Sequence, residues 1–300
     1  MLDINLIGNV IVDRVYKVRV YPVEGESNLN EGYNLCLGGL GNLLESFSLH
    51  KSKLNIGLQA AVAKDENLNF IQERLRQYKK KLRNLNCYLS NSKSYDYNSE
   101  ALILSDLSKS ERTSLVRWGA CLDLSGIKYK NAHWSHISYL DLVTKIDMKS
   151  LRKSCNFLSA DLCLSRMSIF EIKRLKDRLK FLDILFISPN ETKPHYDSSK
   201  DKGDLRNSIH RLIKDVKFQG TIISHSKKSI EVFRKSGLLE ELALPTPRKN
   251  LNTLGAGDWL CANFIRHHLD SDNELNSIIK SCEYAYKTTT KDLINRGEKI

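Results

Sequence analysis

The sequence lacks the features that would mark a membrane protein or a secreted protein. No apolar run approaches the roughly 20 residues needed to cross a bilayer. The first five residues show no basic segment followed by an apolar stretch, so we expect no secretory signal. Cysteine is scarce, with seven residues and no Cys-x-x-Cys pair, and an odd number does not favour a disulfide framework. We therefore expect a soluble, cytoplasmic protein without membrane partners.

Acidic residues are also in deficit. The 300 residues include 47 Lys and Arg but only 35 Asp and Glu, which gives a formal net charge of +12. Basic runs such as Lys79-Lys80-Lys81 lack the interleaved aromatic side chains on which nucleic-acid bases would stack, so we do not expect nucleic-acid binding. A positive field would instead attract phosphorylated, anionic substrates.

Strand-like and helix-like segments alternate along most of the chain. Apolar runs predict strands at residues 4–12, 54–62, 157–162, 182–187 and 220–224, and periodic patterns predict helices at 42–49, 67–85, 168–180, 205–216 and 259–269. Repeated strand–helix units imply an α/β protein with a parallel sheet covered on both faces and an active site at the carboxyl ends of the strands. Two alternating segments, near residues 15–35 and 100–118, fall outside this scheme and predict a small β lid.

A glycine-rich motif near the carboxyl end carries the strongest chemical signal. Asn252-Thr253-Leu254-Gly255-Ala256-Gly257-Asp258 follows a proline-marked loop and opens the last of these predicted helices. Small residues at a helix start leave backbone N–H groups unpaired at the positive end of the helix dipole, where they can bind an anion. Asp258 lies beside them, where its carboxylate could accept a proton from an attacking hydroxyl. Taken alone, the motif favours a plainer interpretation, a glycine turn with an acidic residue that stabilises the helix start.

The motif resembles the D-T-x-G-A-G-D signature of the ribokinase-like (PfkB) carbohydrate kinase family. Three further matches follow the order of that family: Asp13 after the first strand, the run Leu37-Gly38-Gly39-Leu40-Gly41-Asn42, and Phe186-Ile187-Ser188-Pro189-Asn190-Glu191. The segments 101–104 and 110–113 are similar to the strand pair that covers the sugar in this family. Four ordered matches across the whole chain are more specific than any one of them.

The resemblance implies a ribokinase-like, three-layer α/β/α fold with a mainly parallel central sheet and a small β lid. Residues 1–300 would form a single kinase domain, with lid strands from about 13–37 and 98–119. Such lids often form dimer contacts in relatives, so a homodimer through the lid is one expectation.

The resemblance also implies ATP-dependent phosphoryl transfer to a hydroxyl of a sugar or sugar phosphate, with Mg²⁺ bridging the nucleotide phosphates. Asp258 would be the base, and the backbone of Gly255, Ala256 and Gly257 would stabilise the transferring phosphoryl group. Residues implied on the sugar side are Asp13, Gly38, Gly39 and Asn42. Residues implied on the nucleotide side are Asn190, Lys193, Ser224 and Thr253, with Glu191 as a candidate metal ligand.

The chain departs from the family pattern at three positions. Asn252 replaces the first Asp of the carboxyl-terminal signature, and Lys193 stands where an N-x-x-E element would have its Glu. Ser226 replaces the glycine of a Thr-x-Gly element that begins at Ser224. These departures favour one alternative, a catalytically weakened relative that acts as a binding or regulatory protein. A nucleoside kinase of the same fold is a second alternative.

Overall fold

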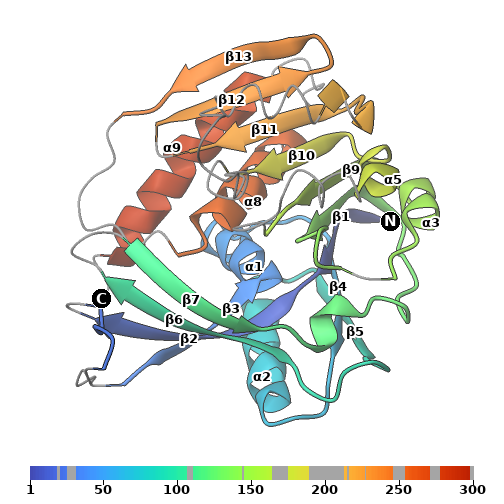
Figure 1. The fold of residues 1–300 in the computed structure, drawn as a ribbon. Helices are drawn as coiled ribbons and strands as arrows, with labels where there is room; N and C mark the ends of the chain where they lie inside the picture. The colour runs from blue at the N-terminus through green and yellow to red at the C-terminus, as the bar shows by residue number, and fades with distance from the viewer. Residues whose placement is uncertain are drawn as a thin grey trace.

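The computed structural model describes residues 1–18, 21–25, 32–106, 111–143, 145–163, 175–188, 213–214, 216–226, 228–245, 254–270 and 278–297. In these ranges the chain forms one large sheet, a smaller sheet beside it, and helices packed on the large sheet (Figure 1). The α/β class expected from the sequence is confirmed.

The large sheet has the strand order β13-β12-β11-β10-β9-β8-β1-β4-β5 (Figure 1). Its strands are β1 (Leu2–Gly8), β4 (Ile56–Val62), β5 (Leu85–Asn91), β8 (Ala132–Ser138), β9 (Cys155–Asp161), β10 (Ile184–Ile187), β11 (Thr221–His225), β12 (Ser229–Arg234) and β13 (Gly237–Ala243). Neighbours from β11 to β5 pair in parallel, and β12 and β13 add an antiparallel edge. A mainly parallel sheet was predicted, and its antiparallel edge was not.

Helices cover the two faces of this sheet and make the molecule three-layered. One face packs against α1 (Leu40–Leu49), α2 (Asn67–Lys81), α8 (Ala256–Asp270) and α9 (Ile278–Gly297), and the other against α3 (Met148–Lys153) and α5 (Lys176–Leu179). A short 3₁₀ helix, Ala120–Leu122, follows the smaller sheet. None of the described helices combines the length and the apolar composition needed to cross a membrane.

Each central strand serves two hydrophobic cores, one on each face of the sheet. In β10, Phe186 belongs to the core beneath α1 and α8, whereas Leu185 and Ile187 belong to the core beneath α3 and α5. A strand buried on both faces has a continuous apolar sequence, which explains why β10 could be predicted from composition. Burying one large apolar side chain contributes about 1.5–3 kcal/mol relative to leaving it exposed.

The smaller sheet, which we call the lid sheet, has the strand order β3-β2-β6-β7. Its strands are β2 (Val10–Val18), β3 (Asn34–Gly39), β6 (Ser99–Asp106) and β7 (Glu111–Arg117). Buried side chains on its inner face, among them Val15 and Ala101, pack against Leu254, the residue before the glycine turn of the motif. The lid sheet therefore lies over the start of α8.

The chain passes from the large sheet to the lid sheet at Gly8 and Asn9. The single strand predicted over residues 4–12 was therefore wrong, because the apolar run is divided between β1 and β2. Gly8 has a φ of 129°, and a Cβ at this position would lie 2.5 Å from the carbonyl oxygen of Ser138. Only glycine fits this break, which carries β2 away from the carboxyl edge of the large sheet.

Two other expectations need correction or fall outside the described ranges. The helix predicted from Asn42 begins two residues earlier, at Leu40, so Asn42 lies in its first turn. The helices predicted at 168–180 and 205–216 lie mostly outside the described residues.

Candidate active site

The turn before α8 depends on Gly255. Its φ is 74°, and a Cβ would lie 2.8 Å from both Cγ and Nδ2 of Asn42. The carbonyl oxygen of Gly255 accepts the backbone N–H of Trp259 at 2.9 Å, which starts the regular hydrogen bonding of the helix. The N–H groups before Trp259 therefore have no partner one turn back within the helix, and they lie at the positive end of its dipole. Such a helix start can bind an anion.

Asp258 lies in the first turn of α8 and is buried. Its Oδ2 accepts a hydrogen bond of 2.7 Å from Nδ2 of Asn42. Burial raises the pKa of Asp258 well above its usual range, and the charge of Asp161 raises it further. The hydrogen bond from Asn42 and the positive charge of Arg112 act in the opposite direction. A carboxylate with a raised pKa is a stronger base once deprotonated, which suits proton abstraction from a hydroxyl.

A second buried carboxylate, Asp161, ends β9 and was not among the predicted site residues. Its Oδ1 accepts the backbone N–H of Tyr139 at 2.5 Å, and its Oδ2 lies 3.3 Å from Nε2 of His136. Burial raises the pKa of Tyr139 well above its usual range, and the charges of Asp258 and Asp161 are among those that raise it further. The sequence did carry a signal for Asp161, which lies one residue before the end of the strand predicted at residues 157–162.

The residues predicted to contact the sugar lie close to one another. Asp13 on β2 lies beside Gly38 on β3, where a Cβ would lie 2.7 Å from Cγ2 of Ile11 and would also collide with the Asp13 carboxylate. Gly39 has a φ of 57°, and its Cβ would lie 2.5 Å from the carbonyl oxygen of Asn9. Both positions therefore require glycine. Asn42 follows within the first turn of α1.

Two arginines place positive charge near Asp13. Burial raises the pKa of Asp13 to about 7, while the charges of Arg112, on the lid sheet, and Arg296, near the end of α9, lower it. Arg296 also donates a hydrogen bond of 3.0 Å to the carbonyl oxygen of Leu254, and its Nη2 lies 3.4 Å from Oε2 of Glu45 on α1. Arg296 therefore joins α9, α1 and the loop before the glycine turn.

On the predicted nucleotide side, Ser224 and His225 end β11. Ser224 is buried and pairs with Ile187 of β10. The neighbouring His225 contacts the glycine turn, since a Cβ at Gly257 would lie 3.2 Å from Cε1 of the imidazole. His225 was not predicted. The predicted residues Asn190, Glu191, Lys193 and Thr253, like Asn252, lie outside the described ranges.

The acidic side chains of the site do not form a metal-binding cage by themselves. Among the described residues, no three His, Cys, Asp or Glu side chains are arranged to hold a metal ion. Mg²⁺ bound with a nucleotide usually takes one or two carboxylates and completes its shell with phosphates and water. Asp161 fits this pattern as one such carboxylate, because its charge acts on Asp258 and a cation beside Asp161 would relieve that repulsion.

A cavity of about 540 Å³ lies away from these residues. Ile213, Lys217, Phe218 and Arg234 are among its lining side chains, and none of the predicted site residues contributes to it. It lies at the amino end of β11, whereas Ser224 and His225 lie at the carboxyl end of that strand. The cavity therefore belongs to another part of the molecule.

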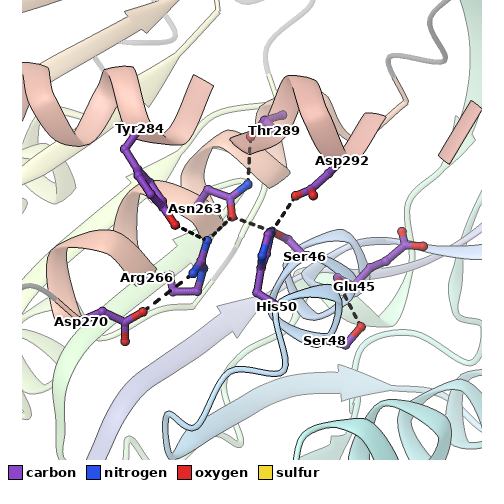
Figure 2. Close-up of polar contacts among 10 residues, drawn as sticks. All are labelled: Glu45, Ser46, Ser48, His50, Asn263, Arg266, Asp270, Tyr284, Thr289 and Asp292. Carbon is purple, nitrogen blue, oxygen red and sulfur yellow. Dashed lines mark hydrogen bonds and ion pairs between the residues drawn. The ribbon is translucent and has the colours of Figure 1, made fainter. Parts of the chain in front are cut away.

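Buried and half-buried polar side chains fix α1 against α8 and α9 beyond the contact between Asn42 and Asp258 (Figure 2). Oδ1 of Asn263 on α8 lies 3.3 Å from Oγ of Ser46 on α1, and its Nδ2 donates to Oγ1 of Thr289 on α9 at 3.0 Å. His50, directly after α1, lies 2.8 Å from Asp292 of α9. These contacts hold the helix that carries Asn42 in register with the helix that carries Asp258.

Comparison with known proteins gives a likeness in structure but not in sequence. No protein-family model and no curated protein sequence matches the chain. Ribokinase from Giardia lamblia matches with a TM-score of 0.70 at 15% identity, over 99% of this chain and 94% of that one. The adenosine kinase of Schistosoma mansoni, in complex with 2-fluoroadenosine, matches with a TM-score of 0.72 at 14% identity, over 97% of this chain and 95% of that one. Fructokinase from Vibrio cholerae O395 matches with a TM-score of 0.67 at 15% identity, over 99% of this chain and 100% of that one.

These three structures cover nearly the whole chain, so the chain has the ribokinase-like fold. The predicted fold class, with its mainly parallel central sheet, is confirmed. At identities of 14–15%, the likeness concerns the fold and does not extend to the chemistry of the site.

Proposed function

We propose that the chain is a phosphotransferase that moves the terminal phosphoryl group of ATP to a hydroxyl of a sugar or sugar phosphate. The observation that carries this proposal is the contact between Asn42 and Asp258 beside the turn at Gly255. It joins a buried carboxylate to a helix start that can bind a phosphate, at the carboxyl edge of the sheet. The kinases named above, which share the fold, support this choice of reaction.

Each part of the site has one task in this reaction. Asp258 accepts the proton of the acceptor hydroxyl while the hydroxyl oxygen forms a bond to the terminal phosphorus and the bond to the ADP oxygen breaks. The backbone N–H groups of the turn from Gly255 to Gly257 stabilise the charge on the transferring group. Asp13 and the backbone near Gly38 bind hydroxyls of the acceptor.

Mg²⁺ would enter with the nucleotide and neutralise charge on its phosphates. Asp161 and Asp258 are the described carboxylates that would lie near it, and Glu191 remains a predicted ligand outside the described residues. The chain's own contribution is to hold the acceptor and the base in place beneath the lid sheet.

A substrate panel tests the proposal. Purified protein with ATP and Mg²⁺ would be incubated with sugars, sugar phosphates and nucleosides, and ADP and phosphorylated product would be measured together. Product from a sugar or sugar phosphate is expected. Product from nucleosides alone would favour the nucleoside kinase, a possibility that the adenosine kinase likeness keeps open. ATP binding without any product across the panel would favour the binding or regulatory protein.

We also propose that the lid sheet forms a homodimer contact. Leu35, Leu102 and Leu115 are 36%, 37% and 72% exposed, and with Arg14 they form one row across four paired strands. Three exposed leucine side chains on one sheet face mark a surface that a partner could cover. Sedimentation velocity should show a dimer that Leu115→Lys converts to a monomer, and a monomeric unmodified protein would contradict the proposal.

We also propose that the protein is located in the cytoplasm. None of the seven cysteines, all of which lie in the described ranges, forms a disulfide, which supports a reducing compartment. ATP is also abundant in the cytoplasm, so the proposed donor and the proposed location agree.

A further inference from the structure

His225 has contacts that the proposed reaction has not yet used. It is the last residue of β11, and its imidazole lies against Gly257, where a Cβ would be 3.2 Å from Cε1 and 3.7 Å from Nε2. Gly257 belongs to the turn whose N–H groups are proposed to bind the transferring phosphoryl group. The imidazole therefore borders the proposed anion site directly.

The imidazole of His225 is available to bind a ligand. Within the described residues, neither ring nitrogen has a hydrogen-bond partner. Burial lowers the pKa of His225 to about 4, with Asp161 acting in the opposite direction, so the ring is neutral near neutral pH. A neutral imidazole has one N–H donor and one acceptor nitrogen. His225 is half-buried, so its donor lies at the border of the proposed anion site, where a phosphate oxygen could accept its hydrogen bond.

The local sequence supports a role that is specific to this chain. Ser224-His225-Ser226 stands where the resemblance would place a Thr-x-Gly element, and Ser226 replaces the glycine. A loop without that glycine offers less freedom for its own backbone to approach a phosphate. A side-chain donor from the adjacent residue can supply a comparable hydrogen bond.

We propose that His225 is a catalytic residue that donates a hydrogen bond from its imidazole to the phosphate chain of the donor, beside the turn at Gly257. This inference rests on the proposed phosphotransferase function and adds a side-chain donor to its anion site. The ring stays neutral while it binds, so the phosphoryl group is polarised without a fixed positive charge that would hold the product.

Pyrophosphate binding tests this role without knowledge of the acceptor. His225→Phe keeps a half-buried aromatic ring and removes both nitrogens, whereas His225→Gln keeps an N–H donor. His133→Phe is the matched control, since His133 lies near the amino end of β8 and packs on Phe157 with ring centres 5.5 Å apart. Affinities for pyrophosphate and for ATP with Mg²⁺ would be measured by calorimetry, and turnover would be measured with the acceptor identified in the panel.

We expect His225→Phe to weaken pyrophosphate binding by roughly 10- to 100-fold, the effect of losing one hydrogen bond to a charged group. kcat should fall as well, while the KM of the acceptor stays the same. His225→Gln should recover most of the affinity, and His133→Phe should match the unmodified protein. Because His225→Phe could fail to fold, ¹⁵N NMR of the unmodified protein should also show the His225 imidazole signal shifting on addition of pyrophosphate.

The outcomes separate this inference from the function on which it rests. If the unmodified protein binds pyrophosphate and ATP, and His225→Phe binds and turns over equally well, the role of His225 is wrong and the proposed function stands. An unchanged His225 signal at saturating pyrophosphate would also overturn the role. If the unmodified protein binds neither ligand, both proposals fail.

Discussion

The side-chain amide of Asn42 lies against Gly255 and donates a hydrogen bond of 2.7 Å to the carboxylate of Asp258. The two hydrogen-bonded residues are 216 positions apart, and the packing of α1 on α8 brings them together. Asn42 therefore has two tasks in the proposed reaction. It belongs to the glycine motif implied on the sugar side, and it orients the proposed base.

Asp258→Asn should lower kcat by roughly two to four orders of magnitude, because an amide cannot accept the hydroxyl proton. Affinity for ATP should survive, since the backbone N–H groups of the turn are unchanged. Steady-state kinetics and calorimetry would measure the two effects. Asp270→Asn, at the exposed end of the same helix, is the matched control. Normal turnover by a folded Asp258→Asn protein would reject the assignment of the base.

Asp161→Asn should shift the pH profile of kcat toward lower pH. The charge of Asp161 is one of the causes that raise the pKa of Asp258, so its removal lowers that pKa. The base works only when it is deprotonated, so kcat rises as the pH passes through this pKa, and the variant should reach its plateau at lower pH. Asp177→Asn, at an exposed position of α5, should leave the profile unchanged. If kcat rises at the same pH in Asp161→Asn and in the unmodified protein, the charge of Asp161 does not raise the pKa of Asp258.

Asp13→Asn should stabilise the protein above pH 7 and have little effect near pH 4. Burial raises the pKa of Asp13 from 3.8 to about 7, so between these values the folded chain keeps a proton that the unfolded chain releases. The free energy of unfolding therefore falls as pH rises through this window, by at most about 4 kcal/mol from this group. Tm measured against pH for both proteins would show the difference.

Asp141→Asn is the matched comparison for this effect. Burial also raises the pKa of Asp141 to about 7, so the same gain in Tm is expected. Only Asp13→Asn should weaken acceptor binding, because Asp141 has no proposed contact with the acceptor. Equal Tm differences at pH 4 and above pH 7 would show that burial of the Asp13 carboxyl does not cost stability.

Gly255→Ala should lower both Tm and the affinity for ATP. A left-handed φ costs a non-glycine residue about 1–2 kcal/mol, and the added Cβ would press on Asn42 at 2.8 Å. Gly126→Ala is the control, since Gly126 is exposed and its Cβ would meet no atom closer than 3.7 Å. Thermal unfolding with and without ATP measures both quantities. An unchanged affinity for ATP in this variant would show that the turn at Gly255 does not bind the phosphates of ATP.

Asn263→Ala should destabilise the packing of α1, α8 and α9. It leaves Ser46 and Thr289 without the amide that joins them, and it removes an oxygen that lies 3.3 Å from Nη2 of Arg266 (Figure 2). Each buried group left unsatisfied costs about 1–3 kcal/mol. Asn86→Ala, at an exposed position in β5, should change Tm little. Equal Tm values for the two variants would show that the network in Figure 2 adds little stability.

The sequence predicted best where one local property decides the structure. The central strands could be located because burial on both faces demands continuous apolar runs, as at residues 182–187. The turn at Gly255 could be located because small residues before a helix leave little choice of geometry. The division of residues 4–12 between two sheets could not, because the run is apolar on both sides of Asn9.

The site residues that escaped prediction owe their position to tertiary packing. Asp161 lies near the end of a predicted strand, but its nearness to Asp258 depends on where α8 returns to the sheet. His225 follows a residue that the family resemblance singled out, and nothing local shows that its ring contacts Gly257. Tyr139 has a φ of 60°, a conformation that a sequence does not reveal for a tyrosine.

The contacts of Arg296 have a consequence for how the protein is made. Arg296 lies in the last turn of α9, yet it holds the carbonyl oxygen of Leu254 and pairs with Glu45. During synthesis, the strands of the sheet leave the ribosome well before this residue does. The site can therefore take its final form only after residue 296 has been translated. A nascent chain that stops short of residue 296 would carry every group proposed for the chemistry and would still lack this connection.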